Sequence, residues 1–95
     1  MVFFSGLYIT QLLRSSSSIG ANYIEANDAL GRGDFLMKIR TSRREAKESG
    51  FWLQLLELAP TPDCQSKHAQ LLDECSQLIR IFSAMIQSVQ RKNSP

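Results

Sequence analysis

The sequence predicts an all-α fold, an up-and-down bundle of helices in a single domain that spans residues 1–95. Two observations predict it. Apolar residues recur at steps of three and four along most of the chain, which is the spacing of one face of an α-helix. The interruptions of this pattern fall at two short stretches that contain glycine or proline, residues 31–33 and 60–62. The chain therefore divides into three predicted helices.

The first predicted helix covers residues 7–30 and contains the segment QLLRSSSSIGANYIEA, residues 11–26. Apolar and small side chains share one of its faces: Leu12, Leu13, Ser16, Ile19, Gly20, Tyr23 and Ile24. A second face is polar throughout: Ser15, Ser18, Asn22 and Glu25. Serine and glycine cost a helix from several tenths to about 1 kcal/mol each relative to alanine. We therefore expect close packing by neighbouring helices to stabilise this one.

The second predicted helix covers residues 34–58, with Asp34 as its N-cap after the glycine turn. Its core stripe is Phe35, Ile39, Ser42, Ala46, Leu53 and Leu56, widened at the far end by Trp52, Leu55 and Ala59. Gly50 interrupts this helix, and we expect a close contact there.

The third predicted helix covers residues 62–90, with Thr61 as N-cap and Pro62 at the first helical position. Its apolar seam is His68, Leu72, Cys75, Ile79, Phe82, Ile86 and Val89, flanked by Leu71, Leu78 and Met85. This stripe is wide enough to pack against two neighbours. The tail, residues 93–95, is expected to fray.

Composition sets limits on function. The net charge of +2 permits contact with nucleic acid without singling it out. No run of about 18 apolar residues is present to span a membrane, and the apolar N-terminus lacks the basic region of a signal peptide. The two cysteines form no CxxC motif, so we expect reduced thiols and a cytoplasmic protein.

The sequence predicts no catalytic residue, metal site or cofactor. Cys64 and His68 lie one helical turn apart and could form a thiolate pair or half of a metal site. Structural zinc needs four cysteine or histidine ligands, and the chain has three in all. Glu45 and Glu48 alternate with basic residues, which favours solvated or inter-subunit ion pairs.

A basic helix face is the candidate for binding nucleic acid. Arg40, Arg43, Arg44 and Lys47 are spaced to stack on one side of the second helix, and Arg32 stands at the preceding turn. Such a face could neutralise several phosphates. The alternative interpretation is a solvated face or an oligomer contact. No aromatic residue interleaves with the basic ones, so stacking on single-stranded bases has little support.

The sequence carries a resemblance to a known protein family in five segments. In chain order they are QLLRSxxSIGAN, Glu25-Ala26, Asp34-Phe35, Glu45-Ala46-x-Glu48 and Trp52-Leu53-x-Leu55-Leu56. The sequence is similar to the bacterial four helix bundle protein family, known also from open reading frames in intervening sequences of large-subunit ribosomal RNA genes. The resemblance implies a small cytoplasmic bundle without an established biochemical activity, assembled as a ring-like homo-oligomer such as a pentamer. It also implies packing or oligomer roles for Arg14, Ser18, Gly20, Asn22, Glu25 and Trp52.

Residues 1–10 do not match the family, in which a full helix and a loop precede the QLLR segment. Met1 lies ten residues before Gln11, so we expect three helices of a four-helix bundle, from a truncated or degenerate member or a misassigned start. Part of the wide apolar stripes would then have no helix packed against it. We therefore expect a non-enzymatic, self-associating protein, with a nucleic-acid (RNA)-binding module as the alternative.

Overall fold

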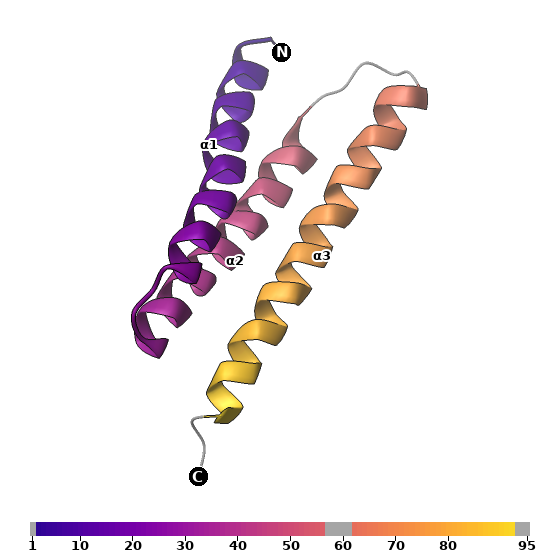
Figure 1. Ribbon diagram of the computed structural model, residues 1–95. Coiled ribbons are helices and arrows are strands. Elements are labelled where there is room, and N and C mark those ends of the chain that lie inside the picture. Colours follow the sequence, from indigo (N-terminus) through magenta and orange to yellow (C-terminus); the bar gives the residue numbers. More distant parts are fainter. Residues whose placement is uncertain (1, 57–61, 93–95) are drawn as a thin grey trace.

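The structure, a computed structural model, describes residues 2–56 and 62–92. It consists there of three α-helices and no strand: α1, Val2–Asn27, α2, Arg32–Leu55, and α3, Pro62–Lys92. The helices run down, up and down again, with α2 between α1 and α3 (Figure 1). This confirms the predicted all-α fold. Among the described residues, no helix combines the length and the apolar character that crossing a membrane requires.

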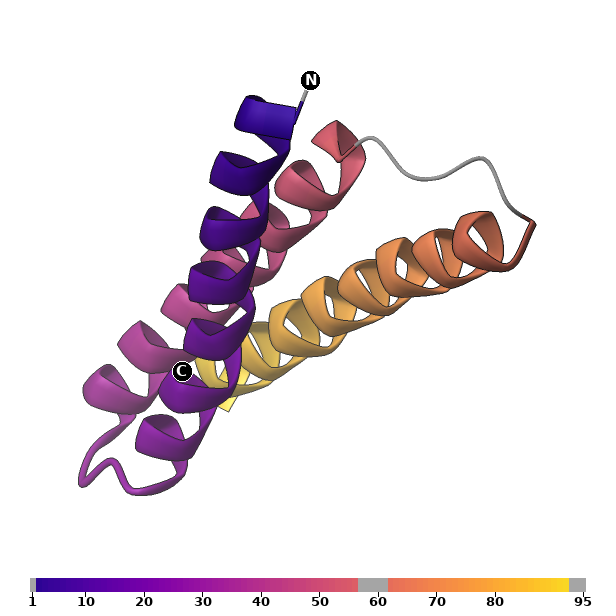
Figure 2. The ribbon, with the colours of Figure 1, turned by 90° about the horizontal axis from the view of Figure 1, so that it is seen from above.

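The two outer helices pack on α2 and not on each other. No Cα atom of α1 lies within 8 Å of a Cα atom of α3 among the described residues. Viewed from above, α3 leans away from α1 toward its Pro62 end (Figure 2). The side chains of Tyr23 on α1 and Phe82 on α3 do meet between the two helices, with ring centroids 6.2 Å apart. The chain is therefore an open layer of three helices around a central one.

The helix boundaries agree with the sequence at α3 and differ at α1 and α2. Helix α1 runs through Gly6 and ends at Asn27, three residues earlier than expected. Helix α2 begins at Arg32, and its N-cap is Gly31 in an extended conformation. Asp34 as N-cap was therefore wrong, because the Phe35 N–H already donates to the Gly31 carbonyl at 3.0 Å. The Asp34 carboxylate still lies in the first turn, where the helix dipole favours a negative charge.

Helix α2 ends at Leu55, and α3 begins at Pro62 as predicted. The last two residues predicted for the second helix, the Thr61 cap and the frayed tail 93–95 lie outside the described residues.

The hydrophobic core lies at the end of the bundle near the α1–α2 turn. Its buried members come from all three helices: Ala26, Ile39, Phe82 and Ile86. In α2 the predicted stripe is well buried at Ile39, Ser42, Ala46 and Leu53. In α3 the predicted seam is fully buried at Phe82 and Ile86 alone, and its other members are half-buried. One helix therefore covers only part of the wide α3 stripe.

The faces of α1 are distributed in an unexpected way. Ser15, on the predicted polar face, is fully buried against α2, whereas Leu13 and Ile24 on the apolar face are 63% and 64% exposed. The Ser42 hydroxyl of α2 donates to the backbone carbonyl of Ile19 at 3.1 Å. Such a contact requires backbones that approach closely, which small side chains permit. Ser15 and Ser42 therefore lie in the α1–α2 interface and Leu13 and Ile24 outside it, while Ile19 of the apolar stripe packs against the core.

Candidate functional site

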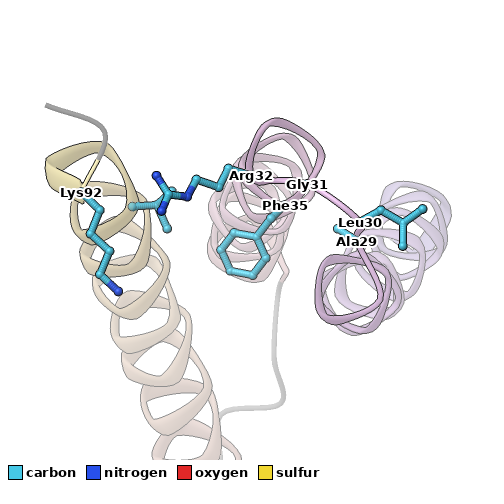
Figure 3. A pocket seen from close by; sticks show the side chains of 7 residues that line it. Ala29, Leu30, Gly31, Arg32, Phe35 and Lys92 are labelled. Carbon is cyan, nitrogen blue, oxygen red and sulfur yellow. The ribbon is translucent and has the colours of Figure 1, made fainter.

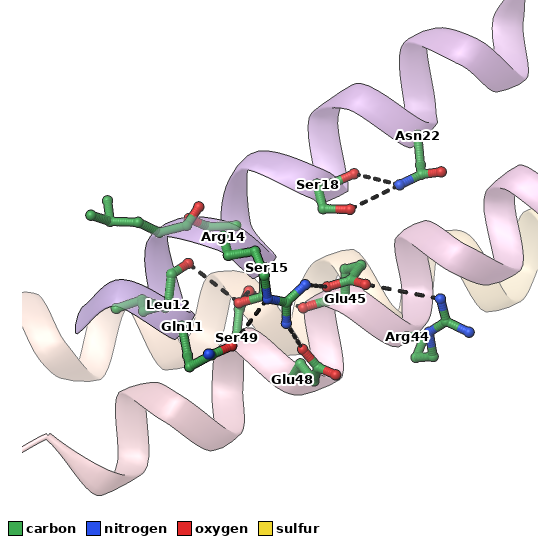
Figure 4. A network of polar contacts seen from close by, with 12 residues as sticks. Gln11, Leu12, Arg14, Ser15, Ser18, Asn22, Arg44, Glu45, Glu48 and Ser49 are labelled. Atoms are coloured by element: carbon green, nitrogen blue, oxygen red, sulfur yellow. Dashed lines mark hydrogen bonds and ion pairs between the residues drawn. The ribbon is translucent and has the colours of Figure 1, made fainter. Parts of the chain in front are cut away.

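A polar network joins α1 to α2 around Arg14 (Figure 4). The Arg14 guanidinium donates to Glu45 at 3.2 Å, to Glu48, and to the Gln11 side chain at 3.0 Å. Glu45 is buried, with 6% exposure. The hydrogen bond to Glu48 and the charges of both carboxylates raise the pKa of Arg14 above its ordinary value. Glu45 and Glu48 thus form ion pairs within the chain. The pair of Glu48 is solvated, as expected, whereas the carboxylate of Glu45 is buried.

The other resemblance-derived residues act mainly inside the chain as well. Glu25 forms an ion pair with Lys38 of α2 at 2.7 Å, and this raises the pKa of Lys38. The Asn22 amide donates to the carbonyl and the hydroxyl of Ser18, both at 2.9 Å, within α1 (Figure 4). Trp52 stacks near Tyr8, with ring centroids 5.8 Å apart.

Gly20 is the exception among these residues. It is exposed, and a Cβ atom built on it would meet no atom within 4 Å. Nothing within the described part of the chain therefore requires a glycine at this position.

The predicted basic face is only partly available. The Arg43 guanidinium donates to the Ser83 hydroxyl of α3 at 3.2 Å and is half-buried. Arg44 is mostly exposed but lies 4.0 Å from Glu45. Arg40 and Lys47 are exposed and form no ion pair with the described residues. The available positive charge is thus concentrated on Arg40, Arg44 and Lys47.

Arg32 lies apart from this face, at the end of the bundle where α2 begins and α3 ends. It lines a shallow cavity of about 390 Å³ together with Phe35, Val89 and Lys92. Figure 3 shows the Arg32 side chain reaching from α2 toward α3 and Lys92. The structure does not bring Arg32 together with Arg40, Arg44 and Lys47.

Phe51 is a surface residue that the sequence interpretation missed. It lies four residues after Lys47, on the same side of α2, and is 52% exposed. Its ring meets Trp52 edge-on, with centroids 5.0 Å apart. An aromatic residue therefore does adjoin the basic ones, and the spacing of one helical turn was the signal that could have revealed it.

An apolar depression, which we call the α1–α3 groove, lies between α1 and α3, and residues of α2 form its floor. One cavity of about 380 Å³ is lined by Leu12, Leu13, Ser16, Ile19, Gly20, Ser49, Leu53, Leu71, Glu74, Cys75 and Leu78. A second, of about 340 Å³, shares Ile19, Gly20 and Leu78 with it and extends to Tyr23, Ile81, Phe82 and Met85. Glu74 is the charged residue among these described lining residues. Burial, with the nearby charge of Glu74, raises the pKa of the Cys75 thiol.

The residues considered for catalysis and metal binding have structural contacts. The Nε2 atom of His68 lies 2.6 Å from the carbonyl oxygen of Leu53, so this ring joins α3 to the end of α2. Cys64 and Cys75 are not part of a disulfide bond within the described residues. Within residues 2–56 and 62–92, no three His, Cys, Asp or Glu side chains gather closely enough to hold a metal ion.

These features define the chain as an all-α helical bundle with an open apolar groove. A solved structure with the same architecture is a protein of unknown function from the S23 ribosomal protein family of Bacteroides thetaiotaomicron. The two superimpose with a TM-score of 0.74 and 29% sequence identity, over 83% of this chain and 72% of that one. No protein-family model matches the chain. No curated protein matches it either.

Proposed function

We propose that this chain is a non-enzymatic helical-bundle protein that acts by associating with further copies of itself. We also propose that it belongs with the S23 ribosomal protein family of its structural neighbour and with the intervening-sequence proteins that it resembles. The observation that carries the proposal is the α1–α3 groove, in which apolar side chains of two helices face each other without a helix between them.

The free energy available from covering this groove is large for a domain of this size. Four large apolar side chains that line it are between 40% and 63% exposed: Leu13, Tyr23, Leu71 and Ile81. Full burial of one such side chain contributes about 1.5–3 kcal/mol, so covering four half-exposed ones gains roughly 3–6 kcal/mol. The net stability of a small domain is about 5–15 kcal/mol. Association would therefore change the stability of this fold substantially.

The cysteines support placing this protein in the reducing cytoplasm. Cys64 and Cys75 are both on α3, separated by about 16 Å along the helix axis at 1.5 Å per residue. A disulfide needs Cα atoms within about 7 Å, so these two cannot pair within one chain.

Sedimentation velocity across the micromolar range tests self-association. We expect the wild-type protein to associate with rising concentration, and Ile81→Glu to remain monomeric because it places a charge in the groove. Met37→Glu is the matched control, since Met37 is similarly exposed, 58% against 53%, but lies on the outer side of α2. A wild-type protein that stays monomeric and unfolds cooperatively would contradict the proposal.

A second candidate function is sequence-independent binding of RNA or another nucleic acid. It is favoured by one observation: Arg40 and Lys47 are exposed without an ion pair among the described residues, and the exposed ring of Phe51 lies one helical turn beyond Lys47. Arginine and lysine contact phosphates, and aromatic rings stack on unpaired bases. The salt dependence of binding tests this candidate, as set out in the Discussion.

A further inference from the structure

We infer that the basic face of α2 continues onto α3 and binds a single-stranded nucleic acid, with one unpaired base seated against Phe51. This inference rests on the second candidate function and names its ligand class, an unpaired base on a phosphate backbone rather than a duplex. The surface, which we call the α2–α3 face, consists of four exposed cations and one exposed ring: Arg40, Arg44, Lys47, Arg80 and Phe51.

Two contacts between α2 and α3 place Arg80 beside the cations of α2. Arg43 donates to Ser83 at 3.2 Å, and a Cβ atom built on Gly50 would lie 3.8 Å from the Cβ of Cys75. The two helices run antiparallel (Figure 1). The segment of α3 between Cys75 and Ser83, which contains Arg80, therefore lies across from the segment of α2 between Arg43 and Gly50.

The side chain of Arg80 belongs to the side of α3 that faces this surface. It follows Ser76 by four residues and precedes Ser83 by three, and residues at these spacings are neighbours on one face of a helix. Ser76 lines a depression between α2 and α3, and Ser83 accepts from Arg43. Arg80 is exposed and forms no ion pair with residues 2–56 and 62–92. It therefore adds a fourth cation to the three on α2.

The depression between α2 and α3 combines a cation with apolar side chains. It has a volume of about 290 Å³, and its lining includes Lys47, Phe51, Leu72 and Ile79. The ring of Phe51 is 52% exposed, whereas Leu72 and Ile79 are half-buried. A flat apolar group can therefore lie against the ring while a negative charge attached to it meets Lys47.

The α2–α3 face is turned away from α1. Lys47 lies two residues from both Glu45 and Ser49, which contact α1. Two residues correspond to about 200° around the axis of a helix, so Lys47 is on the opposite side of α2. A strand bound here therefore leaves the α1–α3 groove uncovered, and its binding can be measured separately from self-association.

The exposed ring selects a single strand over a duplex. In a duplex the bases are paired and stacked, so a basic helix face meets the phosphates and has no use for an aromatic ring beside it. In a single strand each base offers a free face that stacks on an aromatic side chain. The edge-on contact with Trp52, with centroids 5.0 Å apart, orients the Phe51 ring before a base arrives.

Fluorescence anisotropy with labelled oligonucleotides tests the ligand class. The probes are an oligo(U) RNA, an oligo(dT) DNA of the same length, and the oligo(U) strand annealed to its complement. At equal salt we expect the single strands to bind about fivefold or more tightly than the duplex, and the tighter of the two identifies the source of the unpaired base. In the wild-type protein the emission of Trp52, the single tryptophan of the chain, should change with a single strand and not with the duplex.

Variants of Phe51 test the stacking contact. Phe51→Leu keeps an apolar side chain without a ring, so the affinity for oligo(U) should fall by about five- to 150-fold while the salt slope stays the same. Phe51→Tyr restores the ring and should recover the affinity. Circular dichroism checks that both variants are helical, and the Trp52 emission of the wild type decides the point without any substitution.

Arg80→Gln tests the extension of the basic face onto α3. A single strand contributes about 0.7 to the slope of log affinity against log salt for each phosphate contact, so the magnitude should fall from about 2.8 to about 2.1. Lys67→Gln is the matched control on the same helix. Lys67 is paired with Asp63 at 3.3 Å and lies one turn before Leu71, which lines the α1–α3 groove, so its loss should leave the slope unchanged.

The outcomes separate this inference from the function on which it rests. If the duplex binds as tightly as oligo(U) and Phe51→Leu keeps its affinity, the single-strand site is overturned and electrostatic binding by the α2 cations stands. An unchanged slope in Arg80→Gln overturns the continuation onto α3. Absence of binding to all three probes at low salt overturns both the inference and the second candidate function.

Discussion

The hydroxyl oxygens of Ser15 and Ser49 lie 2.8 Å apart in the interface between α1 and α2, where both side chains are buried. Each also has a backbone acceptor on its own helix: Ser15 reaches the Leu12 carbonyl at 3.3 Å, and Ser49 the Glu45 carbonyl at 2.9 Å. Because each hydroxyl carries one hydrogen, one serine donates to the other, and the accepting serine donates to the carbonyl of its own helix, so both buried hydroxyls are hydrogen-bonded. Two helices are held together here by small polar side chains in place of leucines.

This packing predicts that the interface does not tolerate a larger side chain. Ser15→Leu should lower the free energy of unfolding by about 1–3 kcal/mol, because the added methylenes force the two helices apart. Ser66→Leu, at an exposed position of α3, is the control and should stay within about 0.5 kcal/mol of the wild type. Urea denaturation at fixed protein concentration measures both. Equal stability of the two variants would show that α1 and α2 are not closely packed.

The ion pair of Arg14 with the buried Glu45 predicts an asymmetric response to mutation. Arg14→Gln should lower the melting temperature, because the Glu45 carboxylate loses its close partner and keeps Arg44 at 4.0 Å. Lys47→Gln removes an exposed positive charge that forms no ion pair with residues 2–56 and 62–92, and it serves as control. The double variant Arg14→Gln, Glu45→Gln should recover part of the loss, since no uncompensated buried charge remains. If Arg14→Gln melts like Lys47→Gln, the pair contributes nothing to stability.

Gly50 faces α3, where a Cβ atom would lie 3.8 Å from the Cβ of Cys75. The expected close contact is therefore an ordinary van der Waals distance that leaves room for a methyl group. Gly50→Ala should stabilise the protein by about 0.5–1 kcal/mol, because glycine in a helix interior is less favourable than alanine. Thermal unfolding monitored by circular dichroism measures the effect. A destabilised Gly50→Ala variant would place α3 closer to α2 than described.

The arrangement of the basic face predicts the salt dependence of any nucleic-acid binding. The sequence places four cations on this face, but Arg43 is half-buried and hydrogen-bonded to Ser83, which leaves three exposed cations. Three contacts imply a slope of log affinity against log salt of about −2 to −3. The double variant Arg40→Gln, Lys47→Gln removes two of these contacts, so the magnitude of the slope should fall by about 1.4–1.8. Arg43→Gln should leave the slope unchanged. An unaltered slope in the double variant would exclude this face as the site.

The raised pKa of the Cys75 thiol predicts that the stability of the fold depends on pH. Burial, followed by the charge of Glu74, raises its pKa above the ordinary value of 9.0. The folded protein then holds this proton more tightly than the unfolded one, so the stabilising contribution is complete below pH 9.0 and is lost as the pH rises through the folded pKa. Alkylation of Cys75 by iodoacetamide, followed by mass spectrometry, should need a more alkaline pH in native protein than in urea. Coincident pH profiles would contradict this.

The sequence predicts the beginning of α3 well and the beginning of α2 poorly, for a physical reason. Pro62 lacks a backbone N–H and has a fixed φ, so its covalent chemistry suits the first turn of a helix. Asp34 is compatible with a cap but also with the first turn, and the local sequence does not distinguish the two. In the structure the Phe35 N–H donates to the Gly31 carbonyl, and Gly31 is therefore the N-cap of α2.

The site was less predictable than the fold, because periodicity shows which residues share a face and not which face meets a neighbour. Leu13 and Ser15 are two residues apart, and the smaller one is in the interface. The partner of Glu45 is 31 residues away along the chain, so no local pattern reveals it. A signal did exist, since Arg14 belongs to one segment of the resemblance and Glu45 and Glu48 to another, with opposite charges.

The separation of α1 from α3 has a consequence for the order of folding. Helices α1 and α2 are joined by the short segment 28–31, so their contacts are between nearby parts of the chain and close quickly. Helix α3 docks on α2 and contributes to α1 little besides the Tyr23–Phe82 contact. During synthesis the α1–α2 hairpin can therefore form before α3 leaves the ribosome. In native-state hydrogen exchange we expect the Pro62 end of α3 to open separately from the hairpin, as a second cooperative unit.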